Sequence, residues 1–128
     1  MLIKGIPEFE ASLRRKVEAT RTATRTATEA SGALFVQDEQ ADAPKASGKL
    51  AGSIRASGVR QVGEDAFETE VGPHVPYGHR IEAGFHGADA IGRHYEESAE
   101  PYVEPAYDAA REEVPMIYAR AWAEALTI

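Results

Sequence analysis

Apolar residues near the start of the chain recur at helical spacing. Phe9, Leu13 and Val17 follow one another at intervals of four residues, which places them on one face of a helix. Pro7 suits a first helical turn, where a missing backbone N–H leaves no hydrogen bond unmade. The pattern therefore predicts a helix that begins at residue 7.

The segment TRTATRTATEAS, residues 20–31, fits two different periods. Its alternating threonines are typical of a strand, because β-branched residues favour extended structure. It also repeats every four residues, which would stack Arg21, Arg25 and Glu29 along one side of a helix. No glycine or proline interrupts the segment, so we predict one helix over 7–31, with its threonines on a solvated or partner-facing surface.

Turn-forming and acidic residues then predict a loop over 32–46, in which the apolar residues 34–36 leave a short strand open. Beyond it, Leu50 and Ile54 lie four residues apart and share a helical face. This spacing predicts a short helix over 48–54, with Ser47 as its N-cap.

Two segments rich in apolar and β-branched residues follow, at 55–62 and 67–71. In the second segment these residues alternate strictly with glutamates, which is typical of a half-buried strand. The glycine-containing connection at 63–65 joins the two segments. Together they predict a β-hairpin.

A short helix is predicted over 77–83, ended by Gly84. The stretch from 86 to 99 is rich in glycine and charge. It fits a long loop, and it fits a further strand around 91–97 equally well.

The strongest helical pattern lies over 101–126. Apolar residues recur there at three- and four-residue steps from Val103 to Leu126, and Pro105 falls in the first turn. Pro115 falls in the interior, where proline removes a backbone hydrogen bond. Because the apolar stripe keeps its register across Pro115, we predict a bend there and not an end.

These elements predict a single α+β domain over 1–128. A long N-terminal helix, a small and mostly antiparallel sheet with a hairpin, and a long C-terminal helix packed on it would form the fold. The expected organisation is a helix at 7–31, a loop at 32–46, a motif helix and sheet at 47–100, and the C-terminal helix at 101–126.

Composition narrows the function classes. The formal net charge is −7, which argues against binding nucleic acid through general phosphate contacts. The chain has no cysteine, so it can form neither disulfides nor thiolate metal sites. It contains no apolar run long enough to span a membrane and no opening signal segment. We therefore expect a protein that is made in the cytoplasm and makes no membrane contact.

The stretch APKASGKLAGSIRASG at 43–58 raises the question of a phosphate-binding loop. Such a loop needs Gly, four residues, then Gly-Lys followed by Ser or Thr. Here Gly48 and Lys49 are followed by Leu50, and Ala43 occupies the place of the upstream glycine. The spacing excludes a P-loop and favours a short structural helix.

Four histidines, His74, His79, His86 and His94, lie close in the sequence but match no zinc signature. We interpret them as surface or interface residues. No nucleophile elbow or triad pattern is present either. We therefore expect no enzyme, no cofactor and no metal site. The one tryptophan, Trp122, lies on the apolar stripe of the last helix, which favours core or subunit-interface packing.

Four motifs follow one another in a characteristic order: P-x-x-S-G-x-L-x-x-S-I at 44–54, V-G at 71–72, P-Y-x-x-x-I-E-x-G at 76–84, and P-Y-V-x-P-A at 101–106. The series resembles the tail-completion, or head–tail joining, proteins of tailed bacteriophages. Those proteins typically read T-G-x-L-x-x-S-I, V-G, Y-A-x-x-x-E-F-G-T and P-F-L-x-P-A-L. The resemblance spans about half of the chain.

The chain departs from the family pattern at a few positions. Ala83 stands where phenylalanine is usual, and Phe85 follows just beyond. Tyr107 replaces a leucine, and the stretch at 86–100 is longer than in many relatives. We interpret that stretch as a contact arm particular to this virus.

The resemblance implies a structural virion protein without catalysis. It implies a tail-completion or tail-terminator ring subunit in the phage neck, in a ring expected to be a hexamer. Its partners would be other copies of itself, other neck proteins and the major tail tube protein, and DNA would pass through the lumen without specific binding. The alternatives are a head-closure (stopper) ring subunit, and a small non-virion binding protein from a mobile element.

The resemblance further implies structural or interface roles for the motif residues, and the tryptophan on the last helix joins them on its pattern. The first motif would set the turn that positions the hairpin, the third would form a second anchor, and the fourth would start the last helix. The residues given such roles are Gly48, Leu50, Ser53, Ile54, Gly72, Tyr77, Glu82, Gly84, Pro101, Tyr102, Pro105 and Trp122.

Overall fold

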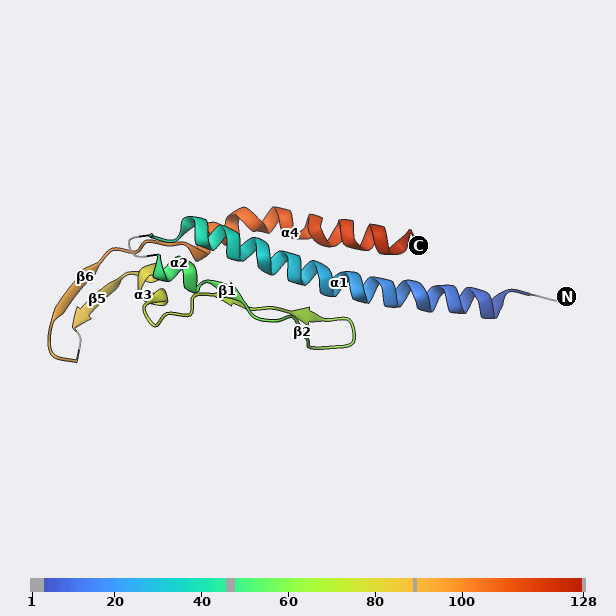
Figure 1. Cartoon of the computed structure of the whole chain (residues 1–128), viewed down its shortest axis with the longest axis horizontal. Coiled ribbons are helices and arrows are strands. Elements are labelled where there is room, and N and C mark those ends of the chain that lie inside the picture. The colour runs from blue at the N-terminus through green and yellow to red at the C-terminus, as the bar shows by residue number, and fades with distance from the viewer. Residues whose placement is uncertain (1–3, 46–47, 89, 128) are drawn as a thin grey trace.

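A computed structural model describes residues 4–45, 48–88 and 90–127. Figure 1 shows an elongated molecule in which two long helices, α1 and α4, run side by side. One β-hairpin lies along the opposite side of α1, and a second hairpin projects from one end. The α+β class, the two long helices and the antiparallel hairpins are confirmed.

Helix α1 (Ile6–Asp42) is the longest element, at 37 residues or about 55 Å. The predicted loop over 32–46 is therefore wrong for most of its length. Gly32 does not end the helix; it lets the hairpin approach closely. A Cβ at this position would lie 2.9 Å from the Thr69 methyl group, so the glycine serves packing and not chain reversal.

Helix α4 (Val103–Leu126) packs antiparallel on α1 and continues through Pro115 without ending, as predicted. Two pairs of hydrogen-bonded side chains join α4 to α1. The Thr28 and Tyr118 hydroxyls are 2.6 Å apart, and the Trp122 indole donates to the Thr24 hydroxyl at 2.9 Å. The threonine segment is helical, but the expectation that its threonines are solvated or partner-facing fails for these two, which face α4.

The first hairpin lies along α1 as two short antiparallel ladders. β1 (Arg55–Ala56) pairs with β4 (Val71–Gly72), and β2 (Arg60–Gln61) pairs with β3 (Phe67–Glu68). The predicted hairpin is confirmed, but its strands are much shorter than the predicted 55–62 and 67–71.

Side chains interrupt the ladder between its two parts. The Thr69 hydroxyl donates to the Ser57 carbonyl at 2.8 Å, and the Ser57 hydroxyl accepts from the Glu70 N–H at 2.9 Å. Local side-chain bonds of this kind compete with regular strand pairing. The sequence pattern shows the alternation of apolar residues but not this competition.

Two side chains of α1 hold the hairpin against the helix. Arg21 donates from Nε to a carboxylate oxygen of Asp65 at 3.1 Å, next to the hairpin turn. The Arg25 guanidinium lies 4.8 Å from the centroid of the Phe67 ring, a cation–π contact. The predicted arginine stripe thus faces the hairpin.

The second hairpin pairs β5 (Phe85–Ala88) with β6 (His94–Glu97). It resolves the choice between loop and strand at 86–99 in favour of a strand. Arg80 supports its base: the guanidinium lies 3.9 Å from the Phe85 ring centroid and makes two hydrogen bonds, of 3.0 and 2.9 Å, to the Glu97 carboxylate. Such a bidentate pair fixes orientation as well as distance.

Two short helices connect the hairpins to the long helices. α2 (Lys49–Ser53) and α3 (Gly78–Ala83) match the predicted short helices. The predicted N-cap Ser47 lies outside the described residues; in the described part, α2 begins after Gly48, which adopts a left-handed conformation with φ 75°.

A small apolar cluster holds the short helices to the ends of the long ones. Ala43, Leu50, Ile54 and Tyr102 are all buried and in mutual contact. We call this cluster, with the polar groups around it, the junction. Within the part of the chain that the structure describes, the strands form three two-stranded ladders, and the helices carry most of the packing between elements.

Gly84, which ends α3, gives a direct test of the fold. Its φ of +77° strains any L-residue, and a Cβ would lie 2.7 Å from the Glu97 carbonyl oxygen. We expect Gly84→Ala to lower the free energy of unfolding by about 2–4 kcal/mol, measured by urea denaturation.

Gly52→Ala is the matched control. Gly52 lies inside α2 with nothing within 4 Å of its Cβ position, so alanine should leave stability unchanged or raise it by up to about 1 kcal/mol. Equal losses for the two variants would contradict the described end of α3.

Candidate functional site

The structure brings several of the predicted motif residues together at the junction. Leu50 and Ile54 come from α2 and Tyr102 comes from the start of α4, and each is at most 3% exposed. Val71, beside the predicted Gly72, packs against the same cluster. Motifs that lie about 50 residues apart in sequence thus meet at one place.

Glu82, on α3, holds the start of α4. One carboxylate oxygen accepts from the Tyr102 N–H at 2.6 Å and the Val103 N–H at 3.0 Å, and the other accepts from the Glu104 N–H at 3.2 Å. These N–H groups have no partner within the helix, and the negative charge lies at the positive end of the helix dipole.

Burial and hydrogen bonding shift the pKa of Glu82 in opposite directions. Burial alone raises the pKa of Glu82, but the three backbone N–H groups lower it by more, so its pKa lies below the ordinary value. Glu82 is therefore ionised at neutral pH and acts as a charged cap supplied from another helix.

Tyr102 joins the polar and apolar parts of the junction. Its ring is 1% exposed, and its hydroxyl donates to the Gly78 carbonyl at 3.0 Å. Burial raises the pKa of Tyr102, and the charges of Glu82 and Glu39 raise it further. The hydroxyl therefore stays protonated and keeps its role as donor.

Ser53 ties the end of the first hairpin to α2. Its hydroxyl donates to the Leu50 carbonyl at 2.7 Å and accepts from the His74 N–H at 3.1 Å. The His74 ring nitrogen Nδ1 lies 3.0 Å from the Ser53 carbonyl oxygen. This serine therefore positions the chain as it leaves Gly72, the last residue of β4.

Other predicted residues lie at the rim of the junction or away from it. Gly48, Tyr77, Pro101 and Pro105 are exposed to solvent. Trp122 lies near the far end of α4, 40% exposed, where it bonds to α1. The structure thus separates the tryptophan from the other motif residues.

Glu39 has no predicted role, because the sequence pattern predicts a loop at this position. Glu39 lies in the last turns of α1 and is only 2% exposed, and its Oε2 has no hydrogen-bond partner within the described chain. Burial, together with the nearby charge of Glu82, raises the pKa of Glu39 to about 7. An acidic residue within an acidic stretch gives no sequence signal of such burial.

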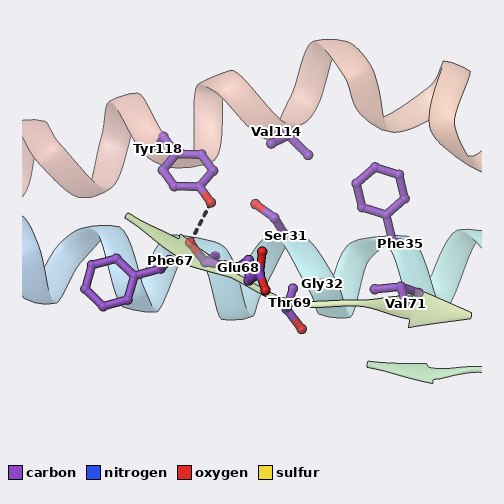
Figure 2. Close-up of a pocket in the computed structure, with 10 residues that line it drawn as sticks. Ser31, Gly32, Phe35, Phe67, Glu68, Thr69, Val71, Val114 and Tyr118 are labelled. Atoms are coloured by element: carbon purple, nitrogen blue, oxygen red, sulfur yellow. Dashed lines mark hydrogen bonds between the residues drawn. The ribbon is translucent and has the colours of Figure 1, made fainter. Parts of the chain in front are cut away.

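A groove of about 390 Å³ opens between α1, α4 and the first hairpin. Figure 2 shows Tyr118 and Val114 of α4 facing Ser31 and Phe35 of α1. Phe67 and Val71 of the hairpin lie beside α1 in this view, across the groove from α4. Its remaining lining residues are Thr28, Gly32, Glu68 and Thr69.

The lining is mainly apolar, with hydroxyl groups between the rings. The Ser31 hydroxyl is buried without a hydrogen-bond partner in the described structure. The groove walls supply one carboxylate, from Glu68, and one phenol, from Tyr118, but no histidine, lysine or cysteine. A lining of this kind suits an apolar side chain.

The four histidines are all exposed. Over residues 4–45, 48–88 and 90–127, no three side chains of histidine, cysteine, aspartate or glutamate come together as a metal site would require. In the same residues, no helix combines the length and apolarity needed to cross a bilayer.

Comparisons with known protein families, with curated protein sequences and with solved structures find no match.

The buried Glu39 predicts an unusual pH dependence. Its pKa is raised to about 7 in the folded chain from 4.5, so the folded state binds the proton more tightly than the unfolded state. Stability is therefore highest below about pH 4.5, where Glu39 is protonated in both states, and it falls as the pH rises from 4.5 to about 7. From 1.36 kcal/mol per pKa unit, the loss reaches about 3 kcal/mol.

We expect Glu39→Gln to remove this loss. The free energy of unfolding of the variant, measured by urea denaturation at about pH 5 and about pH 8, should exceed that of the parent far more at the higher pH, because most of the loss lies above pH 5. Glu29→Gln, at an exposed position of the same helix, is the control. A parallel pH profile for Glu39→Gln and the parent would contradict the burial of Glu39.

The Glu82 cap gives a second stability prediction. We expect Glu82→Gln to lower the free energy of unfolding by about 1–2 kcal/mol, because the amide cannot accept all three N–H groups and lacks the charge. The measurement is made at about pH 5, where Glu39 is protonated in the folded chain and no longer repels Glu82. Glu104→Gln, which changes an exposed acid in the first turn of α4, should cost only a few tenths of a kcal/mol.

Proposed function

We propose that this chain is a structural subunit of the neck of a tailed bacteriophage. It would act as a tail-completion or tail-terminator ring subunit that caps the tail tube and joins it to the head connector, without catalysis. The observation that carries the proposal is the ordered series of motifs, whose central residues Leu50, Ile54, Glu82 and Tyr102 converge on the junction. Such a series is easier to explain when its members support one another physically.

The acidic surface of α4 supports a position of this helix beside DNA in the ring lumen. Glu104, Asp108 and Glu112 are exposed and follow one another at four-residue steps, which forms an acidic row along the helix. Carboxylates repel phosphate, so a ring lumen lined by this row would let DNA pass without binding it. We expect the ring to contain six copies, as the resemblance implies.

The exposed edges of the hairpins support association with neighbours. Each ladder in the described chain has only two strands, so every strand keeps one edge that no other described strand pairs with. In the proposed ring these edges, and the projecting β5–β6 hairpin, would contact other neck proteins and the major tail tube protein.

The proposal is tested in a phage that carries this gene. We expect a deletion mutant to produce filled heads and separate tails with abnormal ends, because the tail tube would lack its cap and its link to the head. Negative-stain or cryo-electron microscopy of lysates measures the fraction of joined particles, and expression of the intact gene from a plasmid should restore it.

Two other outcomes point to the alternatives. Heads that lose their DNA while the tails have normal ends would place the protein at the head-closure ring. Joined and infectious particles in the mutant would remove the virion role and favour a small binding protein of a mobile element.

A further inference from the structure

Helix α1 extends well beyond the end of α4. Thr28 lies opposite Tyr118 and Thr24 opposite Trp122, so the same antiparallel spacing places the last residue of α4, Leu126, at the level of Thr20. The first three turns of α1, residues 6–17, therefore lie beyond α4; we call them the arm. Figure 1 shows the arm projecting past the C-terminal end of α4.

The arm carries an uncovered apolar stripe. Ile6, Phe9, Leu13 and Val17 are 53%, 67%, 51% and 46% exposed. Their spacing continues the face of α1 that packs on α4 through Thr24 and Thr28. The groove at the end of α4, lined in part by Leu13, Val17, Trp122 and Leu126, joins the stripe to that contact.

Such a stripe favours a covering element. Three helical turns on their own are marginal in water, and contiguous exposed apolar residues commonly mark an interaction site. The position beside the stripe lies in line with α4, so the covering element is expected to be a helix of about the arm's own length.

The charges of the arm identify a second copy as the occupant. Among the charged residues that flank the stripe, Glu10 lies in the first half of the arm, and Arg14 and Lys16 lie in the second half. An antiparallel copy brings acidic half against basic half, whereas a parallel copy brings like charges together. The 3.5 Å Arg14–Glu10 pair within the arm is exposed and contributes little, so both groups can pair across the contact.

The rest of the molecule disfavours other contacts between copies. The arm has two acidic and three basic residues, a net charge of +1, whereas the whole chain carries −7. The remainder of the chain therefore carries −8. Copies that meet through their arms bring nearly neutral surfaces together and keep the acidic parts apart.

We propose that two copies associate through their arms, antiparallel about a two-fold axis. Each arm covers the apolar stripe of the other and occupies the space in line with the partner's α4. When residues 6–17 of the two copies overlap antiparallel, Ile6 of one copy lies near Val17 of the other. It also lies beside Trp122 and Leu126 of that other copy. This contact is self-complementary and closes with two copies, and it stands independently of the proposed ring.

Sedimentation velocity of the full chain tests the association. Over about 1 to 300 µM, the range suited to a small interface, the parent should pass from monomer to dimer. Leu13→Gln should raise the dissociation constant at least about tenfold, because the loss occurs in both arms. Arg15→Gln, on the opposite face of the arm, should change it by less than about threefold.

Circular dichroism confirms that each variant keeps its helices, and Phe9→Gln gives a second test at a site 67% exposed. A parent chain that stays monomeric over the whole range would overturn the proposal. So would a dimer that survives Leu13→Gln and Phe9→Gln unchanged.

Single cysteines test the orientation, since the chain contains none of its own. After oxidation, a mixture of Ile6→Cys and Val17→Cys chains should give a disulfide-linked heterodimer, and neither variant alone should link to itself. Linking of each variant to itself would indicate parallel arms and would overturn the antiparallel arrangement.

Discussion

The contact between Glu82 and the first turn of α4 is the constraint on which the architecture depends. One carboxylate from a six-residue helix holds three consecutive backbone N–H groups, and so sets where α4 begins and in which direction it leaves. Tyr102 enters the junction as a result, and α4 runs back along α1. If this cap were displaced, the long helix contact would have to change with it, because both depend on the same starting point.

The same place contains an electrostatic conflict. Glu39 and Glu82 are both partly or fully buried at the junction, and the charge of one raises the pKa of the other. The two carboxyls differ in their hydrogen-bond partners. Glu82 accepts from three N–H donors, whereas one oxygen of Glu39 has no donor among the described residues. Folding therefore keeps one carboxyl charged and favours a proton on its neighbour, which links the packing of α1 to pH.

Sequence patterns predicted the elements better than their contacts. Periodicity gave both long helices, the two short helices and the first hairpin, because each has a local signal in spacing or turn residues. The extension of α1 past Gly32 was missed, since a glycine that permits close packing and a glycine that ends a helix look alike in sequence. The partners of Thr28 and Glu39 were missed for a related reason: they lie on elements about 40 to 90 residues away and leave no local pattern.

The position of the junction at one end of α1 has a mechanical consequence. The helix reaches about 55 Å from its C-terminal end, and α4 and the first hairpin pack along it as far as Thr24 and Arg21, so these elements would turn together about the short helices. A rotation of about 5° at the short helices would carry the tip through about 5 Å, nearly one helical turn. A contact that turned the long helices by this much relative to α3 and the second hairpin would therefore displace the arm by several ångströms relative to that hairpin.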